Sequence, residues 1–208
     1  MTKVLTFILI VILLAGCSQR TSVGLTCVSC KPYVCRGSYY IPQKYYEYDE
    51  VGLASWYGED FHGKPKATGE KFDKYLMTAA HRTLPIPSVV KVTNLKNGKS
   101  VIVVVDDRGP YTYRGRIIDL SYAAAKAIGV GVTKVRVQTL VSDSLQLSNY
   151  IALACKKRKD PFGRSWAQLY FDVIKRGKVQ CYKGSQELNK KQKNSKKKYN
   201  PLGKYIKT

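Results

Sequence analysis

Short apolar runs with the spacing of β-strands dominate the middle of the chain. The runs 89–95 and 100–105 are rich in valine and are joined around Asn97-Gly98. This dipeptide predicts a type I′ hairpin turn, because both central positions of that turn need positive φ. Three further runs predict strands, namely 51–57, 116–120 and 134–140. The run 134–140 alternates valine with polar residues, as a half-buried strand does. Many short strands with glycine between them predict a compact β-barrel.

One short helix is predicted within this segment. Ser121 can cap a helix over residues 122–128, and Gly129 can end it. Further on, residues 166–174 have an apolar face that fits either a helix or a strand, and the lysine-rich end of the chain lacks the apolar surface needed to fold. We therefore divide the chain into a signal peptide (1–16), a tether and lead-in (17–50), a barrel (51–140) and a basic, partly disordered C-terminal extension (141–208).

The N-terminus has the features of a bacterial lipoprotein signal. Lys3 gives a short positive start, and residues 4–14 form an uncharged apolar run that suits a signal-peptide core but is too short to span a bilayer comfortably. The run ends in LAGC (14–17), which resembles the lipobox where the signal is removed before a cysteine. We expect Cys17 to carry the lipid that anchors the protein to the cell membrane or outer membrane, facing the periplasm. The alternatives are an incidental cysteine or an uncleaved anchor helix.

The charge of the chain is strongly positive. Lys and Arg number 36 against 14 Asp and Glu, which gives a formal net charge of +22. Such a chain prefers anionic partners, namely nucleic acid, anionic lipid or an acidic wall polymer. Export would remove nucleic acid from this set, which leaves lipid and the cell wall.

Five cysteines follow Cys17, and export would place them in an oxidising compartment. They are Cys27, Cys30, Cys35, Cys155 and Cys181. The CxxC spacing at 27–30 also fits zinc, but neither His62 nor His81 lies at a suitable spacing to complete a site. We expect disulfides, with Cys155–Cys181 as the preferred pair. Because five is odd, one thiol is left free or joins another chain.

Carboxylates are the side chains in the barrel segment that can carry chemistry. The chain has two histidines, and it lacks a Walker loop, a dinucleotide fingerprint and a zinc-binding HExxH helix. Glu70 lies beside a glycine in a loop, Asp107 ends an apolar strand before Arg-Gly-Pro, and Asp119 lies inside an apolar strand. Cleavage of a glycosidic bond requires acids of this kind, which protonate the leaving oxygen. A solvated or hydrogen-bonded structural role is the alternative for each.

Five motifs of this segment resemble, in the same order, those of the rare lipoprotein A family. They are GLASWYG (52–58), ATGEKF (67–72), TAAHRTLP (78–85), DRGP (107–110) and GRIIDLS (115–121). The resemblance implies a mainly β fold, a six-stranded double-psi β-barrel with one or two short helices. Characterised members are septal lytic transglycosylases that cleave peptidoglycan glycan strands and favour strands stripped of stem peptides. Expansins share the barrel and loosen walls without clear hydrolysis.

The resemblance also assigns roles to residues. It implies that Asp107 and Glu70 are catalytic, and that a second group binds substrate or supports the site: Trp56, Tyr57, His81, Arg108 and Asp119. Members often have asparagine where this chain has Asp106, whose charge would raise the pKa of a neighbouring acid. Many members also carry a C-terminal glycan-binding domain, which residues 141–208 do not match.

Together these features predict an endolytic lytic transglycosylase that leaves 1,6-anhydro-muramic acid ends. Neither a metal nor an organic cofactor is expected. The expected partners are peptidoglycan glycan strands and a membrane, with division-site proteins as further candidates and nucleic acid excluded. The alternatives are an expansin-like lipoprotein that binds peptidoglycan without cutting it, and a structural tether between membrane and wall.

Overall fold

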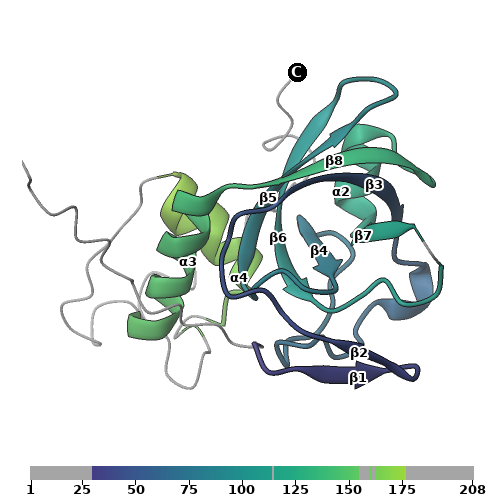
Figure 1. Cartoon of the computed structure of the whole chain (residues 1–208). Helices are drawn as coiled ribbons and strands as arrows, with labels where there is room; N and C mark the ends of the chain where they lie inside the picture. Colours follow the sequence, from purple (N-terminus) through teal and green to yellow (C-terminus); the bar gives the residue numbers. More distant parts are fainter. Residues whose placement is uncertain (1–29, 114, 155–159, 161–162, 177–208) are drawn as a thin grey trace, which may run out of the picture.

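Six strands form the body of the protein, which is described here from a computed structural model covering residues 30–113, 115–154, 160 and 163–176. The strands are β3 (Asp49–Trp56), β4 (Thr78–His81), β5 (Ser88–Asn94), β6 (Ser100–Asp107), β7 (Arg116–Leu120) and β8 (Thr133–Thr139). They close into a barrel in the order β3-β7-β4-β6-β5-β8 (Figure 1). The pairs β3–β7 and β4–β6 are parallel and the other four are antiparallel. The predicted six-stranded, mainly β barrel is confirmed.

Valine side chains fill the barrel. On β5, Val89, Val90 and Val92 are fully buried while Lys91 between them is exposed, and four valines of β6 are buried as well. Removing this apolar surface from water is the main stabilising contribution to such a core.

The β5–β6 hairpin is confirmed, but its turn differs from the predicted type I′ turn. Gly98 has a φ of +71°, whereas Asn97 is not among the residues with positive φ. Strand β5 ends at Asn94 and β6 begins at Ser100, so the connection is longer than a two-residue turn. The Asn94 carbonyl accepts the Gly98 N–H at 2.8 Å, and the Asn94 side chain donates to the Ile128 carbonyl at 2.9 Å. Contacts with the neighbouring helix thus favour the longer loop.

The helix within the barrel segment has the predicted limits and caps. Helix α2 (Tyr122–Ile128) begins after Ser121, whose hydroxyl accepts the Ala124 N–H at 3.2 Å. Gly129 ends it in the left-handed conformation, with a φ of +65°. Both caps follow from local sequence alone.

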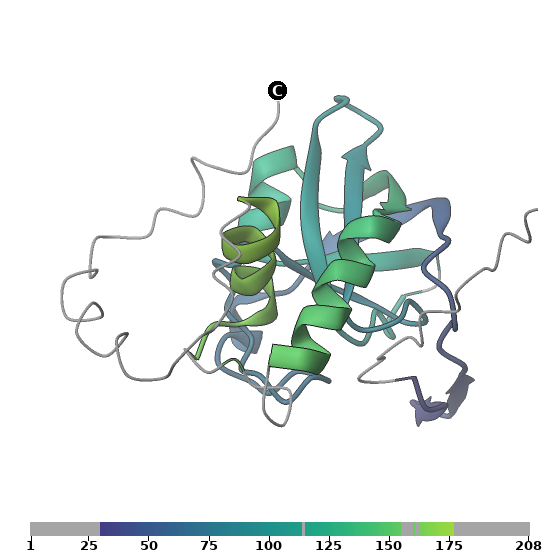
Figure 2. The ribbon, with the colours of Figure 1, turned by 90° about the vertical axis from the view of Figure 1, so that its left-hand side faces the viewer.

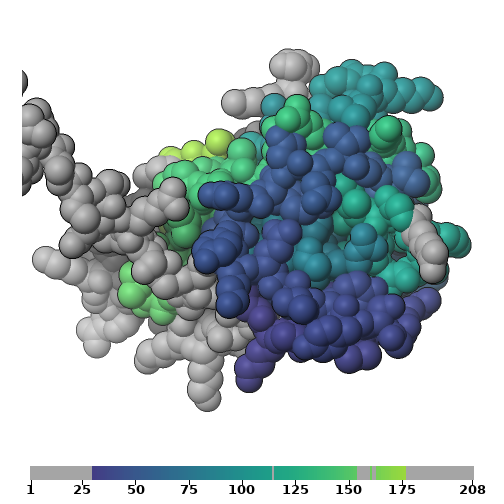
Figure 3. Space-filling model, viewed as in Figure 1, coloured from purple at the N-terminus to yellow at the C-terminus, as the bar shows by residue number. Residues whose placement is uncertain are grey.

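A small hairpin precedes the barrel. It consists of β1 (Tyr33–Cys35) and β2 (Ser38–Tyr40), and it lies along the lower edge of the barrel in Figure 1, purple in the space-filling view of Figure 3. The Tyr33 hydroxyl donates to the Arg82 carbonyl at 2.8 Å, and the Tyr40 and Tyr111 rings are 5.5 Å apart. Tyrosine contacts therefore hold the hairpin against the loop that follows Asp107.

Two of the cysteines lie in this described region. Cys30 is disulfide-bonded and Cys35 has a free thiol. The lipidation candidate Cys17 and the predicted pair Cys155–Cys181 lie outside the described residues.

Two helical segments from the C-terminal extension pack on the barrel. Helix α3 (Val141–Ala154) lies against β5, and its Ser144 hydroxyl accepts the Val89 N–H at 2.8 Å. Helix α4 (Trp166–Leu169) continues into the π-helical η2 (Tyr170–Lys175), and Figure 2 shows these elements beside α3. Trp166, Leu169 and Tyr170 are fully buried in the same apolar core as the barrel valines. The segment 166–174, which fitted either a helix or a strand, is helical.

No helix among the described residues combines the length and the apolar character needed to cross a bilayer.

Candidate active site

Two of the predicted acids lie in one row across neighbouring strands. Ala80 of β4 pairs with Asp107 of β6 on one side and with Asp119 of β7 on the other, and Asp119 pairs in turn with Ser55 of β3. Residues opposite each other on adjacent strands share a face of the sheet. Asp107 and Asp119 therefore flank the small, fully buried side chain of Ala80.

The carboxylate of Asp107 is fixed by three donors. Its Oδ1 accepts the backbone N–H groups of Ala67 and Arg108, each at 2.8 Å. Its Oδ2 accepts the Tyr57 hydroxyl at 3.1 Å. Burial and, after it, the nearby charge of Asp107 raise the pKa of Tyr57 well above its ordinary value. The hydroxyl therefore stays protonated and acts as a hydrogen-bond donor to Asp107. Asp107 is half-buried and thus both oriented and reachable from solvent.

A β-bulge places Asp106 and Asp107 against the same loop. Ala79 pairs with Val105 and Ala80 with Asp107, so Asp106 is the extra residue of β6. On a regular strand, consecutive side chains would point to opposite faces. Here Asp107 accepts from Ala67 while Asp106 forms a buried ion pair with Lys66. Burial raises the pKa of Asp106 to about 7, although Lys66 acts in the opposite direction.

Glu70 lies in the loop that provides these contacts, residues 64–72. The Phe72 N–H donates to the Lys64 carbonyl and the Lys66 N–H to the Glu70 carbonyl, both at 2.8 Å. Both carboxylate oxygens of Glu70 are engaged within the protein. Its Oε2 accepts from Lys66 Nζ at 3.0 Å, and its Oε1 accepts the Trp166 N–H at 3.2 Å. Glu70 therefore joins the loop to the C-terminal helix α4.

Asp119 is buried and held by two side chains. The Ser55 hydroxyl donates to its Oδ1 at 2.8 Å and Arg116 Nη2 donates to its Oδ2 at 3.0 Å. Burial raises the pKa of Asp119, and these two partners counteract the rise. Both of these hydrogen bonds come from side chains.

The remaining predicted residues surround this row. His81 Nδ1 accepts the N–H groups of Thr83 at 3.2 Å and Leu84 at 2.9 Å, and Arg108 donates to the carbonyls of His81 and Leu84. These bonds shape the loop after β4, so both residues support the fold around the site. Trp56 is exposed at the barrel surface, with its ring against the Tyr122 ring at 5.7 Å.

Two contributors were not identified from the sequence. Lys66 and the N–H of Trp166 both bind Glu70, yet a lone lysine in a loop and a buried tryptophan carry no recognisable motif. No group of three His, Cys, Asp or Glu able to hold a metal ion occurs within the described residues. The described part of the site thus consists of carboxylates, their donors and one buried lysine.

The barrel segment is similar to known proteins. A family model described as "Lytic transglycolase" matches residues 49–138. The chain is 55% identical over 115 residues to an endolytic peptidoglycan transglycosylase RlpA of Pseudomonas aeruginosa, covering 53% of this chain and 33% of that protein. The proteins of the same name from Vibrio cholerae and Rickettsia prowazekii are 56% identical over 117 residues and 42% identical over 150 residues. These matches cover 54% and 69% of this chain, and 44% and 46% of those proteins. The chain thus spans a third to about half the length of the curated relatives it matches.

Proposed function

We propose that the protein is a member of the rare lipoprotein A family of lytic transglycosylases and cleaves the glycan strands of peptidoglycan. The match of residues 49–138 to the lytic transglycolase family model and the 55–56% identity to two RlpA proteins over 115–117 residues support this proposal. One observation carries the proposal. At the end of β6, Asp107 presents a half-buried carboxylate that two backbone N–H groups and the Tyr57 hydroxyl hold in a fixed orientation. A general acid or base needs this combination of access and fixed geometry.

In the proposed reaction, Asp107 transfers a proton to the glycosidic oxygen as the bond from that oxygen to C1 of the muramic sugar breaks. The resulting carboxylate takes the proton of the C6 hydroxyl of the same sugar, and the C6 oxygen bonds to C1. Asp107 recovers its proton, the strand ends in 1,6-anhydro-muramic acid, and no water is consumed. Positive charge develops at C1 during bond cleavage, and the carboxylate formed on Asp107 would help to stabilise it.

Glu70 has a supporting role in this reaction. Its two oxygens already accept from Lys66 and Trp166, which supports a part in shaping the site and its charge rather than in carrying the transferred proton. Asp119, bound by Ser55 and Arg116, supports the strand row that positions Asp107.

The proposed location follows from the N-terminal sequence. The apolar run 4–14 and the LAGC motif support lipidation at Cys17 and attachment to a membrane facing the periplasm. That location would bring the barrel to the peptidoglycan, and it makes division-site proteins candidate partners.

The test is mass spectrometry of purified, stem-peptide-free glycan strands incubated with the full-length protein. We expect fragments with 1,6-anhydro-muramic ends. Asp107→Asn and Glu70→Gln should each abolish cleavage while leaving the barrel folded, because an isosteric amide costs little packing but cannot transfer the proton or carry the charge. Asp60→Asn, at an exposed position of the short 3₁₀ helix η1 (Glu59–Phe61), is the control and should cleave normally.

Two other results would redirect the assignment. Reducing ends in place of anhydro ends would show that water is the nucleophile and that the protein is a hydrolase. Glycan binding without cleavage would favour the expansin-like alternative, with which the engagement of both Glu70 oxygens inside the protein is also compatible.

A further inference from the structure

Lys66 is a lysine whose side chain is 1% exposed, in a loop at the surface of the barrel. Burying an ammonium ion is costly unless its charge is paired and its protons are bound. Lys66 Nζ donates to Glu70 Oε2 at 3.0 Å and also to Asp106 Oδ2. Glu70 is one of the two residues assigned to catalysis, and Asp106 directly precedes the other, Asp107. The lysine is therefore placed where its charge acts on the site.

The charges around Lys66 show that it remains an ammonium ion. Burial lowers the pKa of Lys66, but the carboxylates of Asp106 and Glu70 outweigh burial and raise it above the ordinary value. Asp106 Oδ1 is buried and has no hydrogen-bond partner among the described residues, so this acid depends on Lys66 for its stabilisation.

Lys66 also reaches Asp107 through the backbone. The next residue, Ala67, donates its N–H to Asp107 Oδ1 at 2.8 Å. With Nζ held between Asp106 and Glu70, the lysine links the loop to the bulged end of β6. Movement of Lys66 would shift both the Ala67 N–H and the Glu70 carboxylate.

We propose that Lys66 is a positioning residue of the active site, which holds Glu70 and the Ala67 N–H in place for Asp107 and balances the charge of Asp106. This role rests on the proposed transglycosylase function. The competing explanation is that Lys66 serves only as the counter-ion of Asp106. The two differ in what should happen when both charges of that pair are removed together.

The experiment compares full-length wild type with Lys66→Met, Asp106→Asn and the double variant. Lys66→Met leaves a buried carboxylate unpaired and should lower the Tm by about 10 °C. The double variant no longer leaves the fully buried Asp106 unpaired, and Glu70, which also loses its lysine, is partly exposed, so most of this loss should be recovered. Its kcat on glycan strands should nevertheless stay about 10- to 100-fold below that of wild type with KM unchanged, because Glu70 and the loop have lost their anchor. A double variant that cleaves at the wild-type rate would overturn the proposal.

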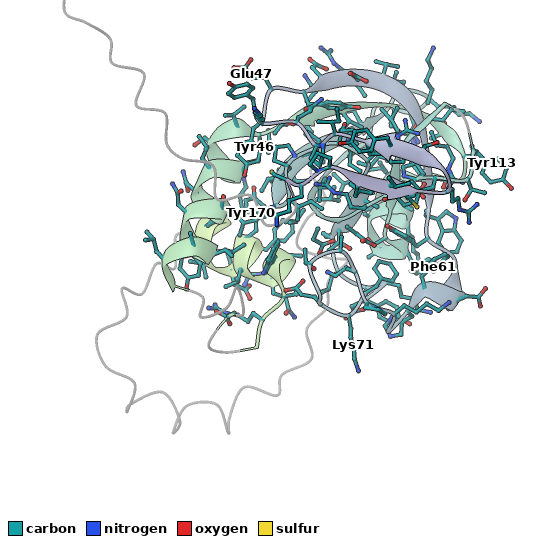
Figure 4. The ribbon with its side chains drawn as sticks, turned by 60° about the horizontal axis from the view of Figure 1, so that its bottom comes forward. Tyr46, Glu47, Phe61, Lys71, Tyr113 and Tyr170 are labelled. Atoms are coloured by element: carbon teal, nitrogen blue, oxygen red, sulfur yellow. The ribbon has the colours of Figure 1, made fainter. Side chains whose placement is uncertain are left out.

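Lys71→Met is the matched control. Lys71 belongs to the same loop, but its side chain is exposed and points away from the protein in Figure 4. This variant should keep the wild-type Tm and kcat. An equal loss of kcat in Lys71→Met and in the double variant would show a general effect of loop substitution and would also overturn the proposal.

A second measurement is independent of activity. In the Asp106→Asn background, Glu70→Gln should lower the Tm when Lys66 is present and have a clearly smaller effect when residue 66 is methionine, since the two side chains interact directly. Equal Tm shifts in the two backgrounds would refute the contact on which the proposal depends. This result stands whether or not wild type cleaves glycan, so failure of the positioning role is distinguishable from failure of the transglycosylase function.

Discussion

We expect His81 to make the stability of the barrel sensitive to acid. The ring is buried, and its Nδ1 accepts the N–H groups of Thr83 and Leu84, which places the ring hydrogen on Nε2 of a neutral imidazole. Burial, together with the positive charges of Arg82 and Arg108, lowers the pKa of His81 from 6.5 to about 3. Protonation would destroy both accepted bonds and place a cation in the core.

The sign and size of the effect follow from this pKa. Between pH 6.5 and about pH 3 the unfolded chain binds a proton at His81 that the folded chain does not, so the free energy of unfolding falls as the pH falls. Each pH unit in this window contributes about 1.4 kcal/mol. At about pH 4.5 the loss is about 3 kcal/mol, which corresponds to about 5–10 °C in Tm for a chain of this length.

His81→Asn tests this reasoning. The asparagine side-chain oxygen can replace Nδ1 as acceptor for Thr83 and Leu84 but does not titrate. Between about pH 7.5 and about pH 4.5 the Tm of wild type should fall about 5–10 °C further than that of the variant. His62→Asn, at an exposed histidine, is the control and should follow wild type. If the curves of wild type and His81→Asn run parallel over this range, His81 is not neutral in the fold.

Three further predictions concern other parts of the chain. Asp119→Asn should reduce both activity and stability, by about 1–3 kcal/mol in urea unfolding, because Arg116 loses its buried carboxylate partner. Cys17→Ala should abolish incorporation of labelled fatty acid, and unchanged labelling would exclude Cys17 as the lipidation site. Deletion of residues 187–208, which contain eight lysines and one glutamate, should weaken binding to the sacculus. It should also make the remaining binding less sensitive to a rise in salt from about 0.1 M to about 1 M. A merely solubilising tail would leave both the binding and its salt dependence unchanged.

The elements that could be predicted from the sequence are those with local signals. Strand β7 and helix α2 have the predicted limits, because Ser121 and Gly129 mark the helix ends whatever surrounds them. Strands β3, β5, β6 and β8 begin or end one or two residues from the predicted limits, where pairing with neighbours decides the last residue. Strand β4 was not predicted, because its four residues are too few to show a periodic pattern.

The C-terminal helices could not be predicted in the same way. The apolar pattern of residues 166–174 suits a helix or a strand, and the choice depends on the surface that receives Trp166 and Tyr170. That surface is made by the barrel strands, which are distant in sequence. Similarly, the three-residue strands β1 and β2 are too short to give a periodic signal and are held by tyrosine contacts with Arg82 and Tyr111.

The site shows the same division between local motif and tertiary contact. Resemblance to known motifs assigned catalytic roles to Asp107 and Glu70, because each lies in a short conspicuous sequence, and these roles stay predictions. The Lys66–Asp106 pair joins residues 40 positions apart, and it forms because the bulge in β6 leaves Asp106 facing the loop. The sequence predicted that the charge of Asp106 would raise the pKa of a neighbouring acid, but it did not identify Lys66 as the counter-ion of Asp106.

The presence of Lys66 explains how two consecutive acids can occupy this end of β6. An asparagine in place of Asp106 would bring no charge into the core and would need no ammonium partner. An aspartate there is fully buried, and without a cation its ionised form would be strongly disfavoured. The loop lysine provides that cation and at the same time binds Glu70. Asp106 and Lys66 therefore have to be considered together: we expect Asp106→Asn alone to be tolerated, since Lys66 keeps Glu70 as a partner, and Lys66→Met alone to be the more damaging of the two.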